Sequence, residues 1–150
     1  MDCLAGMGQS FAGQSEAEAF YYEQRDKDLN ELKELGAAHP TLALDKSPES
    51  LLRIEQFYFE CFVNKKAPAP VTKERLEELV TQYTRQVFAT HNIATWTVFE
   101  NEFSPGRYDI GLDFGGGGTN QQFGADLGEK DGSEGGRYLY ELFMAYKPGS

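Results

Sequence analysis

The chain has 150 residues, of which 40% are hydrophobic and 13% aromatic, so it can bury a core as one domain and is unlike a disordered protein. Its formal net charge is −10, and two segments carry the imbalance: residues 16–34 hold seven acids and three bases, and residues 100–134 hold eight acids and two bases. This charge disfavours binding to nucleic acid or to anionic membranes and leaves basic proteins as the electrostatic match.

Cysteine and histidine are scarce in this chain. Cys3 and Cys61 are poorly placed for a disulfide, which indicates reduced thiols. His39 and His91 form no spacing that is typical of a zinc or iron site. The first residues lack the positive charge of a signal peptide, and no apolar run approaches the roughly 20 residues that span a bilayer. We therefore expect a cytoplasmic protein without a metal or another cofactor.

The N-terminal region is predicted to contain a leader and one helix. Residues 1–14 are rich in glycine and small residues without periodicity, and we expect a flexible leader. Ser15, followed three residues later by Glu18, matches a capping box, and Gly36 is typical of a helix end. These signals predict a surface helix over residues 16–35.

Two further helices are predicted from cap signals and apolar faces. Ser47 followed by Pro48 starts a helix that runs to about Val63, and its broad apolar face indicates the central buried helix. Thr72 starts the next helix, which ends near His91 and has a narrow apolar stripe. Opposite that stripe lies a charged back of Lys73, Glu74, Glu77, Glu78 and Arg85.

Beyond residue 95 the apolar period changes from helical to alternating. Trp96 and Val98 begin one alternating run, and residues 108–114 form a second, so we predict two antiparallel strands joined through Ser104-Pro105-Gly106. The large indole of Trp96 is most simply a core anchor.

The last third of the chain is predicted to hold a long loop and a final element. Residues 115–136 are rich in glycine, polar and acidic, and we expect a mobile loop. Their glycine run lacks the lysine of a phosphate loop, and their acids miss the spacing of a calcium loop. Residues 137–146 fit a strand or a short helix, with the strand favoured. The expected fold is one α+β domain over residues 15–150, with about three N-terminal helices packed on a small C-terminal antiparallel sheet.

Glu55 is the sharpest anomaly, because it projects from the apolar face of the helix over residues 48–63. A carboxylate there must be paired, hydrogen-bonded or neutralised, and a structural network is favoured over a general base. His91 is the candidate acid–base partner, since a helix C-terminus favours its protonated form. No serine or cysteine motif supplies a nucleophile, so the sequence favours a protein that is not an enzyme.

One stretch carries a family resemblance. Residues 44–51 read Leu-Asp-Lys-Ser-Pro-Glu-Ser-Leu and precede a helix, a proline-rich connector, a helix containing Tyr83 and a strand opened by Trp96. Over residues 42–114 this resembles small bacterial α+β proteins, some of which are regarded as immunity proteins of toxin systems. The chain has Asn-Ile-Ala-Thr at residues 92–95, where such relatives often carry glycines, and no functional residue is transferred.

Acidic charge and the lack of catalytic motifs favour a non-catalytic protein-binding domain, such as an immunity protein that neutralises a basic toxin. The alternatives are a secretion or assembly chaperone, a small-molecule-binding domain, and an enzyme that uses Glu55 and His91. The sequence leaves the oligomeric state open. In the leading hypothesis eight carboxylates contact the basic partner: Glu100, Glu102, Asp109, Asp113, Asp126, Glu129, Asp131 and Glu134.

Overall fold

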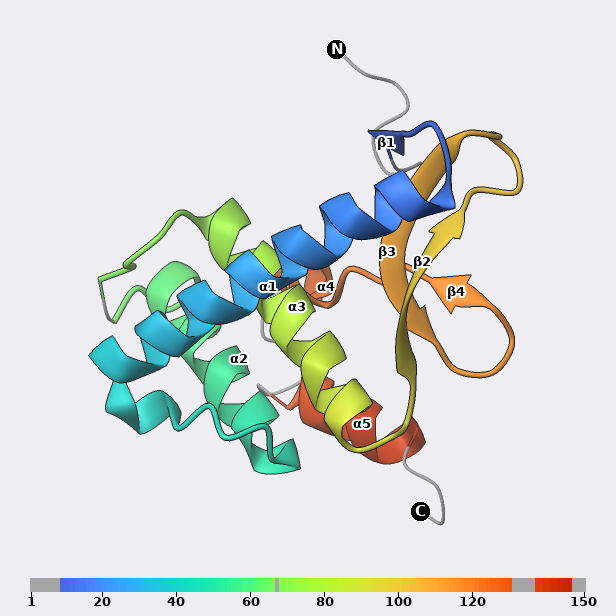
Figure 1. Ribbon diagram of the computed structural model, residues 1–150. Coiled ribbons are helices and arrows are strands. Elements are labelled where there is room, and N and C mark those ends of the chain that lie inside the picture. Colours follow the sequence, from blue (N-terminus) through green and yellow to red (C-terminus); the bar gives the residue numbers. More distant parts are fainter. Residues whose placement is uncertain (1–8, 67, 131–136, 147–150) are drawn as a thin grey trace.

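The computed structural model describes residues 9–66, 68–130 and 137–146. Its helices gather on one side of the molecule and a small antiparallel sheet lies on the other (Figure 1), which confirms the predicted α+β class. The elements in chain order are β1 (Gln9–Ser10), α1 (Gln14–Ala38), a 3₁₀ helix (Pro40–Leu42), α2 (Pro48–Phe62), α3 (Lys73–Thr90), β2 (Thr95–Glu100), β3 (Arg107–Asp113), β4 (Gly118–Thr119), α4 (Phe123–Lys130) and α5 (Tyr138–Tyr146).

The sheet is built around the predicted hairpin. β2 and β3 pair along their length, from Thr95 opposite Asp113 to Glu100 opposite Tyr108. The short strands β1 and β4 each add two residue pairs to β3, at its start and at its end respectively. Gly106 closes the hairpin turn with a φ of 85°, a conformation that glycine adopts without strain.

α3 is the central helix of the fold, a position that the sequence suggested for α2. It packs against α1, α2 and α4 and also contacts β2 and β3. Figure 1 shows it passing behind α1, with α2 on one side and the sheet on the other. Its buried residues include the polar side chains of Thr81, Gln82, Thr84 and Arg85, because neighbours cover more of its circumference than its narrow apolar stripe indicated. None of the helices in the described part of the chain has the length and apolar character needed to cross a bilayer.

The N-terminal boundaries differ from the prediction. α1 begins at Gln14, and Gly13 precedes it without a side-chain cap, so Ser15 lies inside the first turn and the predicted capping box is wrong. The helix also continues through Gly36 to Ala38. Residues 9–10 of the expected leader form β1 in the sheet, and residues 1–8 lie outside the described residues.

Tertiary contacts explain this longer first helix. A second core cluster joins Ala17 and Tyr21 of α1 to Val98, Tyr108 and Ile110 of the sheet. The Gln14 side-chain amide donates a hydrogen bond of 2.6 Å to the carbonyl of Val98. Packing on the sheet therefore stabilises a helix start that has no local cap.

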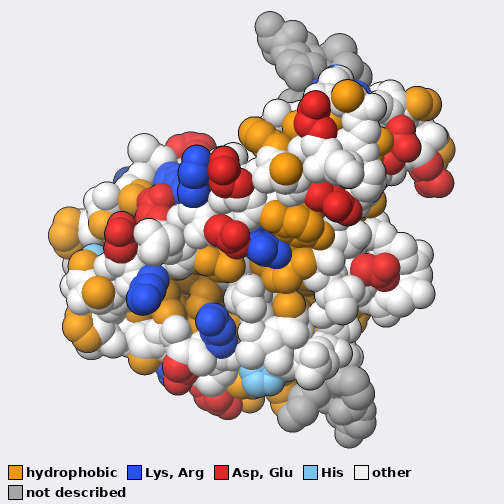
Figure 2. Space-filling model, in the orientation of Figure 1, with side chains coloured by type: hydrophobic (Ala, Val, Ile, Leu, Met, Phe, Trp, Pro, Cys, Tyr) orange, Lys and Arg blue, Asp and Glu red, His pale blue; other side chains and the backbone are white. Residues whose placement is uncertain are grey.

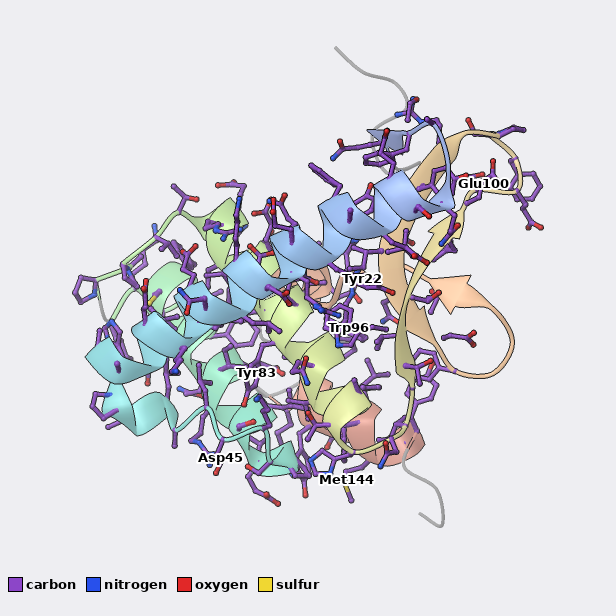
Figure 3. All side chains as sticks on the ribbon, in the orientation of Figure 1. Tyr22, Asp45, Tyr83, Trp96, Glu100 and Met144 are labelled. Atoms are coloured by element: carbon purple, nitrogen blue, oxygen red, sulfur yellow. The ribbon has the colours of Figure 1, made fainter. Side chains whose placement is uncertain are left out.

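Trp96 connects the two cores. Its half-buried ring packs against both clusters, and its indole N–H donates to Oε1 of Gln86 at 3.2 Å. The guanidinium carbon of Arg25 lies 4.6 Å from the ring centre of Tyr22 and 5.2 Å from that of Trp96. Figure 3 shows Tyr22 and Trp96 at the junction of α1 with the sheet.

The C-terminal region holds two corrections. The predicted loop over residues 115–136 contains β4 and α4 within its described part, while residues 131–136 lie outside the described residues. The favoured strand over residues 137–146 is wrong, because this segment forms α5. α4 packs on α3 and α5 packs on α2, so both helices complete the core that the first helices leave open.

The predicted caps of α2 and α3 are confirmed and yield a stability prediction. The hydroxyl oxygen of Thr72 accepts the amide of Arg75 at 3.1 Å, just as Ser47 accepts the amide of Ser50. We expect Thr72→Ala to lower the free energy of unfolding by about 1 kcal/mol. Urea unfolding followed by circular dichroism checks this, with Thr41→Ala, at an exposed position, as the control that should change little. Equal destabilisation by the two changes would contradict the capping role.

Candidate functional site

Four of the eight acids predicted to bind a partner use their carboxylates inside the chain, and two of these hold turns. Glu100 accepts the amide of Gly106 at 2.7 Å across the hairpin turn. Asp113 accepts the amides of Gly115 and Gly117 at 2.7 and 3.3 Å and so orders the start of the glycine-rich segment. These two carboxylates stabilise loop backbone as well as contributing charge.

The other two acids lie in polar contacts between elements. Asp109 accepts the amide of Ile110 at 2.8 Å with one oxygen and the side-chain amide of Asn120 with the other. Asp126 accepts the hydroxyl of Tyr138 at 3.1 Å. Burial, together with the negative charge of Asp126, raises the pKa of Tyr138 to about 12. Both carboxylates therefore have internal partners.

Of the remaining four acids, one has a described side chain. Glu102 is exposed in the turn between β2 and β3. The side chain of Glu129 and the whole of Asp131 and Glu134 lie outside the described residues. The structure thus brings Glu100 and Glu102 together on one turn and places Asp109, Asp113 and Asp126 elsewhere.

The end of the β2–β3 hairpin, residues 100–107, is the most exposed apolar feature described, and we call it the hairpin tip. Phe103 lies there with 83% of its surface exposed. A groove of about 390 Å³ lies between this tip and the glycine-rich segment and is lined in part by Phe99, Glu102 and Phe103. Figure 3 shows Glu100 at this projecting end, and Figure 2 shows acidic side chains gathered over it.

The tip has a defined backbone. The amide of Asn101 donates to the carbonyl of Arg107 at 2.8 Å, and the amide of Arg107 donates to the carbonyl of Ser104 at 3.1 Å. The side chain of Asn101 also accepts the amide of Phe103 at 2.8 Å. These bonds, with the one from Gly106 to Glu100, hold Phe103 outward on an ordered turn.

Glu55 has a structural contact that explains its burial. The side chain is 0% exposed, and its two oxygens accept the amides of Tyr138 and Leu139 at 3.0 and 2.8 Å. These amides open α5 and have no partner within that helix, so a carboxylate on α2 acts as their cap. The sequence favours a structural network for Glu55 with an arginine or a tryptophan N–H, and the described donors are instead two backbone amides.

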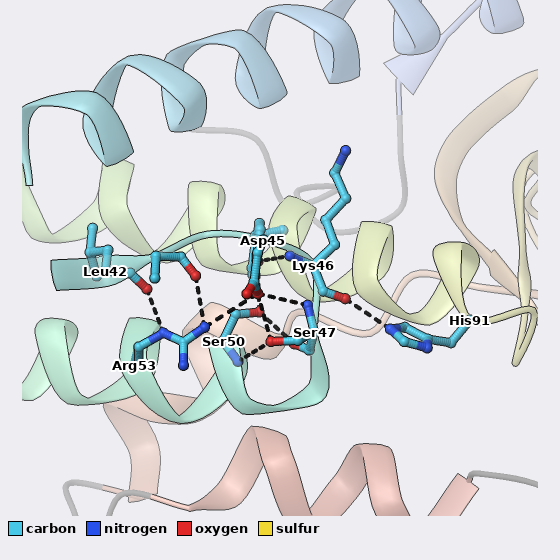
Figure 4. A network of polar contacts seen from close by, with 9 residues as sticks. Leu42, Asp45, Lys46, Ser47, Ser50, Arg53 and His91 are labelled. Carbon is cyan, nitrogen blue, oxygen red and sulfur yellow. Dashed lines mark hydrogen bonds and ion pairs between the residues drawn. The ribbon is translucent and has the colours of Figure 1, made fainter. Parts of the chain in front are cut away.

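His91 lies at a different helix junction. It is exposed at the end of α3, and its Nε2 is 2.8 Å from the carbonyl oxygen of Lys46 (Figure 4). Its ring meets Phe143 edge-on, with the centroids 5.3 Å apart. The described hydrogen bonds of Glu55 and of His91 thus serve separate helix ends.

The segment that His91 touches is a polar strap before α2 (Figure 4). Asp45 accepts the hydroxyl and the amide of Ser47 at 2.6 and 3.0 Å, and these bonds hold the pKa of Asp45 below its usual value. Arg53 donates to the carbonyls of Leu42 and Ala43. These contacts position the start of α2.

A polar cavity between α1, α3 and β3 contains the charged group that the sequence reasoning missed. Arg85 is 3% exposed, although the sequence placed it on the charged back of α3. Its guanidinium donates to Oε1 of Gln82 at 2.9 Å and to the carbonyl of Gln121 at 3.2 Å. Burial lowers the pKa of Arg85 to about 10, and the nearby charge of Asp109 opposes part of that shift.

A second buried charge faces the same cavity from α1. Asp28 is 5% exposed, accepts from Arg75 at 2.8 Å and accepts from Nε2 of Gln82 at 3.2 Å. Arg75 also pairs with Glu31 and Glu78 at 2.6 and 3.0 Å. Its hydrogen bond to Glu31, followed by those to Asp28 and Glu78, raises its pKa. Only the tertiary arrangement reveals this site, because Asp28 and Arg85 are distant in sequence.

Comparison with known proteins gives a family for this chain. The family model for "Uncharacterised protein YwmA" matches residues 10–147, which extends beyond the 42–114 region of the sequence resemblance. A protein of that name from Bacillus subtilis (strain 168) is 31% identical over 99 residues, which cover 65% of this chain and 62% of the relative. No solved structure matches the chain. A family match over nearly the whole chain means that this protein belongs to the YwmA family.

Proposed function

We propose that this protein is a non-catalytic protein-binding domain that contacts a basic partner through its hairpin tip. The observation that carries the proposal is the 83% exposure of Phe103 on an ordered turn beside Glu100 and Glu102. Exposed aromatic side chains are frequent centres of protein interfaces, since their burial removes a large apolar area from water.

The surroundings of Phe103 suit such a role. Its turn is held by backbone hydrogen bonds, so little conformational entropy is lost when a partner binds. The groove beside it gives an apolar side chain of the partner a place against Phe99. Phe103 can therefore insert into a pocket of the partner, and the groove can accept an apolar side chain from the partner.

Charge selects the class of partner. Glu100 and Glu102 flank the aromatic, and the whole chain carries a net charge of −10. A basic surface would be steered toward this tip, and its association would weaken as salt screens the charges. A cationic toxin is one partner with this chemistry, and the protein would then act as a cytoplasmic immunity protein that covers the toxin surface.

Affinity capture from the lysate of the native host tests the proposal. We expect the wild-type chain to retain a basic protein at low salt and to release it at high salt. Phe103→Ser should reduce the retained amount by at least about tenfold, which is the loss of a typical interface anchor. Glu102→Lys should also weaken capture because it reverses the charge beside the anchor.

The matched control is Glu34→Lys, which makes the same charge change at an exposed position on α1. This variant should retain the partner nearly as well as the wild type. Equal capture by wild-type and Phe103→Ser chains, or no basic protein on the wild-type column, would contradict the proposal.

A further inference from the structure

The cavity between α1, α3 and β3 has features of a ligand site, and it is separate from the hairpin tip. Its volume is about 320 Å³, at the lower end of the range found for small-molecule sites. Its wall carries Asp28 from α1, Gln82 and Arg85 from α3, and Asp109 from β3. Three elements from distant parts of the sequence therefore bring charged groups to one small space.

Arg85 is almost fully buried in the wall of this cavity. Within residues 9–66, 68–130 and 137–146 its hydrogen bonds go to two neutral oxygens, and no carboxylate forms an ion pair with it. A buried charge without such a pair is costly, and the nearby charge of Asp109 offsets only part of this cost. A carboxylate of a ligand would supply a direct ion pair. The lowered pKa of Arg85 reflects the same loss of water.

Gln82 holds a positive and a negative group with the two ends of its side-chain amide. Its Oε1 accepts from Arg85 and its Nε2 donates to Asp28. Asp28 is also paired with Arg75, so its position is held from two sides. The Gln82 amide thus holds the guanidinium of Arg85 and the carboxylate of Asp28 in fixed positions on the wall of the cavity.

The charge balance of the lining selects the ligand class. Asp28, Glu78 and Asp109 are negative, whereas Arg75 and Arg85 are positive, so the wall has one excess negative charge. A dianion such as phosphate would be repelled by the three carboxylates. A small ligand with one carboxylate and one ammonium group matches this mixed lining, because it carries a partner for Arg85 and a partner for the excess carboxylate.

We propose that this cavity binds a small zwitterion of the α-amino acid class. The carboxylate of the ligand pairs with the guanidinium of Arg85, and its ammonium group faces the carboxylates of Asp28 and Asp109. Phe20, Tyr21 and Ile110 line the same cavity and provide an apolar wall for the ligand's side chain. This inference does not depend on partner binding at the hairpin tip.

Isothermal calorimetry of the wild-type chain with individual amino acids tests the proposal. We expect at least one amino acid to bind. Its methyl ester, which lacks the carboxylate, and its N-acetyl form, which lacks the ammonium, should each bind at least about tenfold more weakly, equal to about 1.4 kcal/mol. Inorganic phosphate should not compete.

Substitutions of Arg85 test whether the amino acid binds in this cavity. Arg85→Gln should abolish the preference for the amino acid over its methyl ester, whereas Arg85→Lys, which keeps the charge, should retain part of it. Arg137→Gln is the control, because Arg137 is an exposed arginine that pairs with Glu141. In nuclear magnetic resonance spectra of the wild type, the ligand should shift the amide signals of Gln82, Arg85 and Ile110, a result that needs no folded variant.

The proposal would be overturned if no amino acid bound, if the amino acid and its two blocked forms had equal affinity, or if binding shifted signals away from this cavity. Competition by phosphate would also overturn it, because the site would then recognise a dianion.

Discussion

Gly124→Ala is expected to lower the free energy of unfolding by about 3 kcal/mol, because α4 lies directly against the backbone of α3. A Cβ at position 124 would collide with the carbonyl of Glu77, and its three nearest neighbours are all backbone atoms of that residue. The amide of Gly124 also donates to Oγ1 of Thr81 at 2.8 Å, which fixes the approach. Neither helix backbone can move aside without losing packing.

Urea unfolding followed by circular dichroism measures this effect. Gly116→Ala is the matched control, since a Cβ there meets nothing within 4 Å. We expect this control to change the stability by less than about 1 kcal/mol. Identical urea midpoints for the two variants would show that α4 does not pack on α3 as described.

Glu55→Ala is expected to destabilise the protein by about 3 kcal/mol, because the buried amide of Leu139 and the part-buried amide of Tyr138 would lose their acceptors. Glu55→Gln keeps one acceptor oxygen and should have an intermediate effect. Hydrogen exchange gives a sharper measurement than global unfolding, since the amides of Tyr138 and Leu139 should lose protection before the rest of the core.

Glu60→Ala serves as the control for Glu55, because Glu60 lies on the same helix and its described hydrogen bond is with the side chain of Gln56, one turn away. Its effect should be within about 0.5 kcal/mol. If Glu55→Ala were no more destabilising than this control, or if exchange at Tyr138 were unchanged, the capping role of Glu55 would be refuted.

The candidate sites show how far sequence reasoning reaches. The alternating pattern places acidic residues of the 100–113 range on the hairpin, but their individual roles depend on neighbours, since the amide of Gly106 donates to Glu100 and Asn120 donates to Asp109. An aromatic beside Ser104-Pro105-Gly106 in a turn is the sequence signal for Phe103. The sequence pattern puts Arg85 on a charged helix back, and no local pattern marks it as buried.

Local chemistry determined the class of the fold and the best-defined boundaries. Ser47, Pro48 and Thr72 start α2 and α3 through contacts within one turn, and alternating residues define the β2–β3 hairpin. These features depend on neighbours three or four residues away in a helix, or across one short turn, so a single sequence contains the needed information.

Tertiary contacts alone decided the remaining features. Residues 137–146 form a helix whose first amides are capped by Glu55, more than 80 residues earlier, so no local signal distinguished helix from strand. α1 starts without a cap because the sheet stabilises it, and Arg85 is buried because α1, α4 and β3 enclose α3. In each case the stabilising group comes from a distant part of the chain. The free energy that its tertiary contacts contribute exceeds the small local preferences for helix or strand that sequence patterns report.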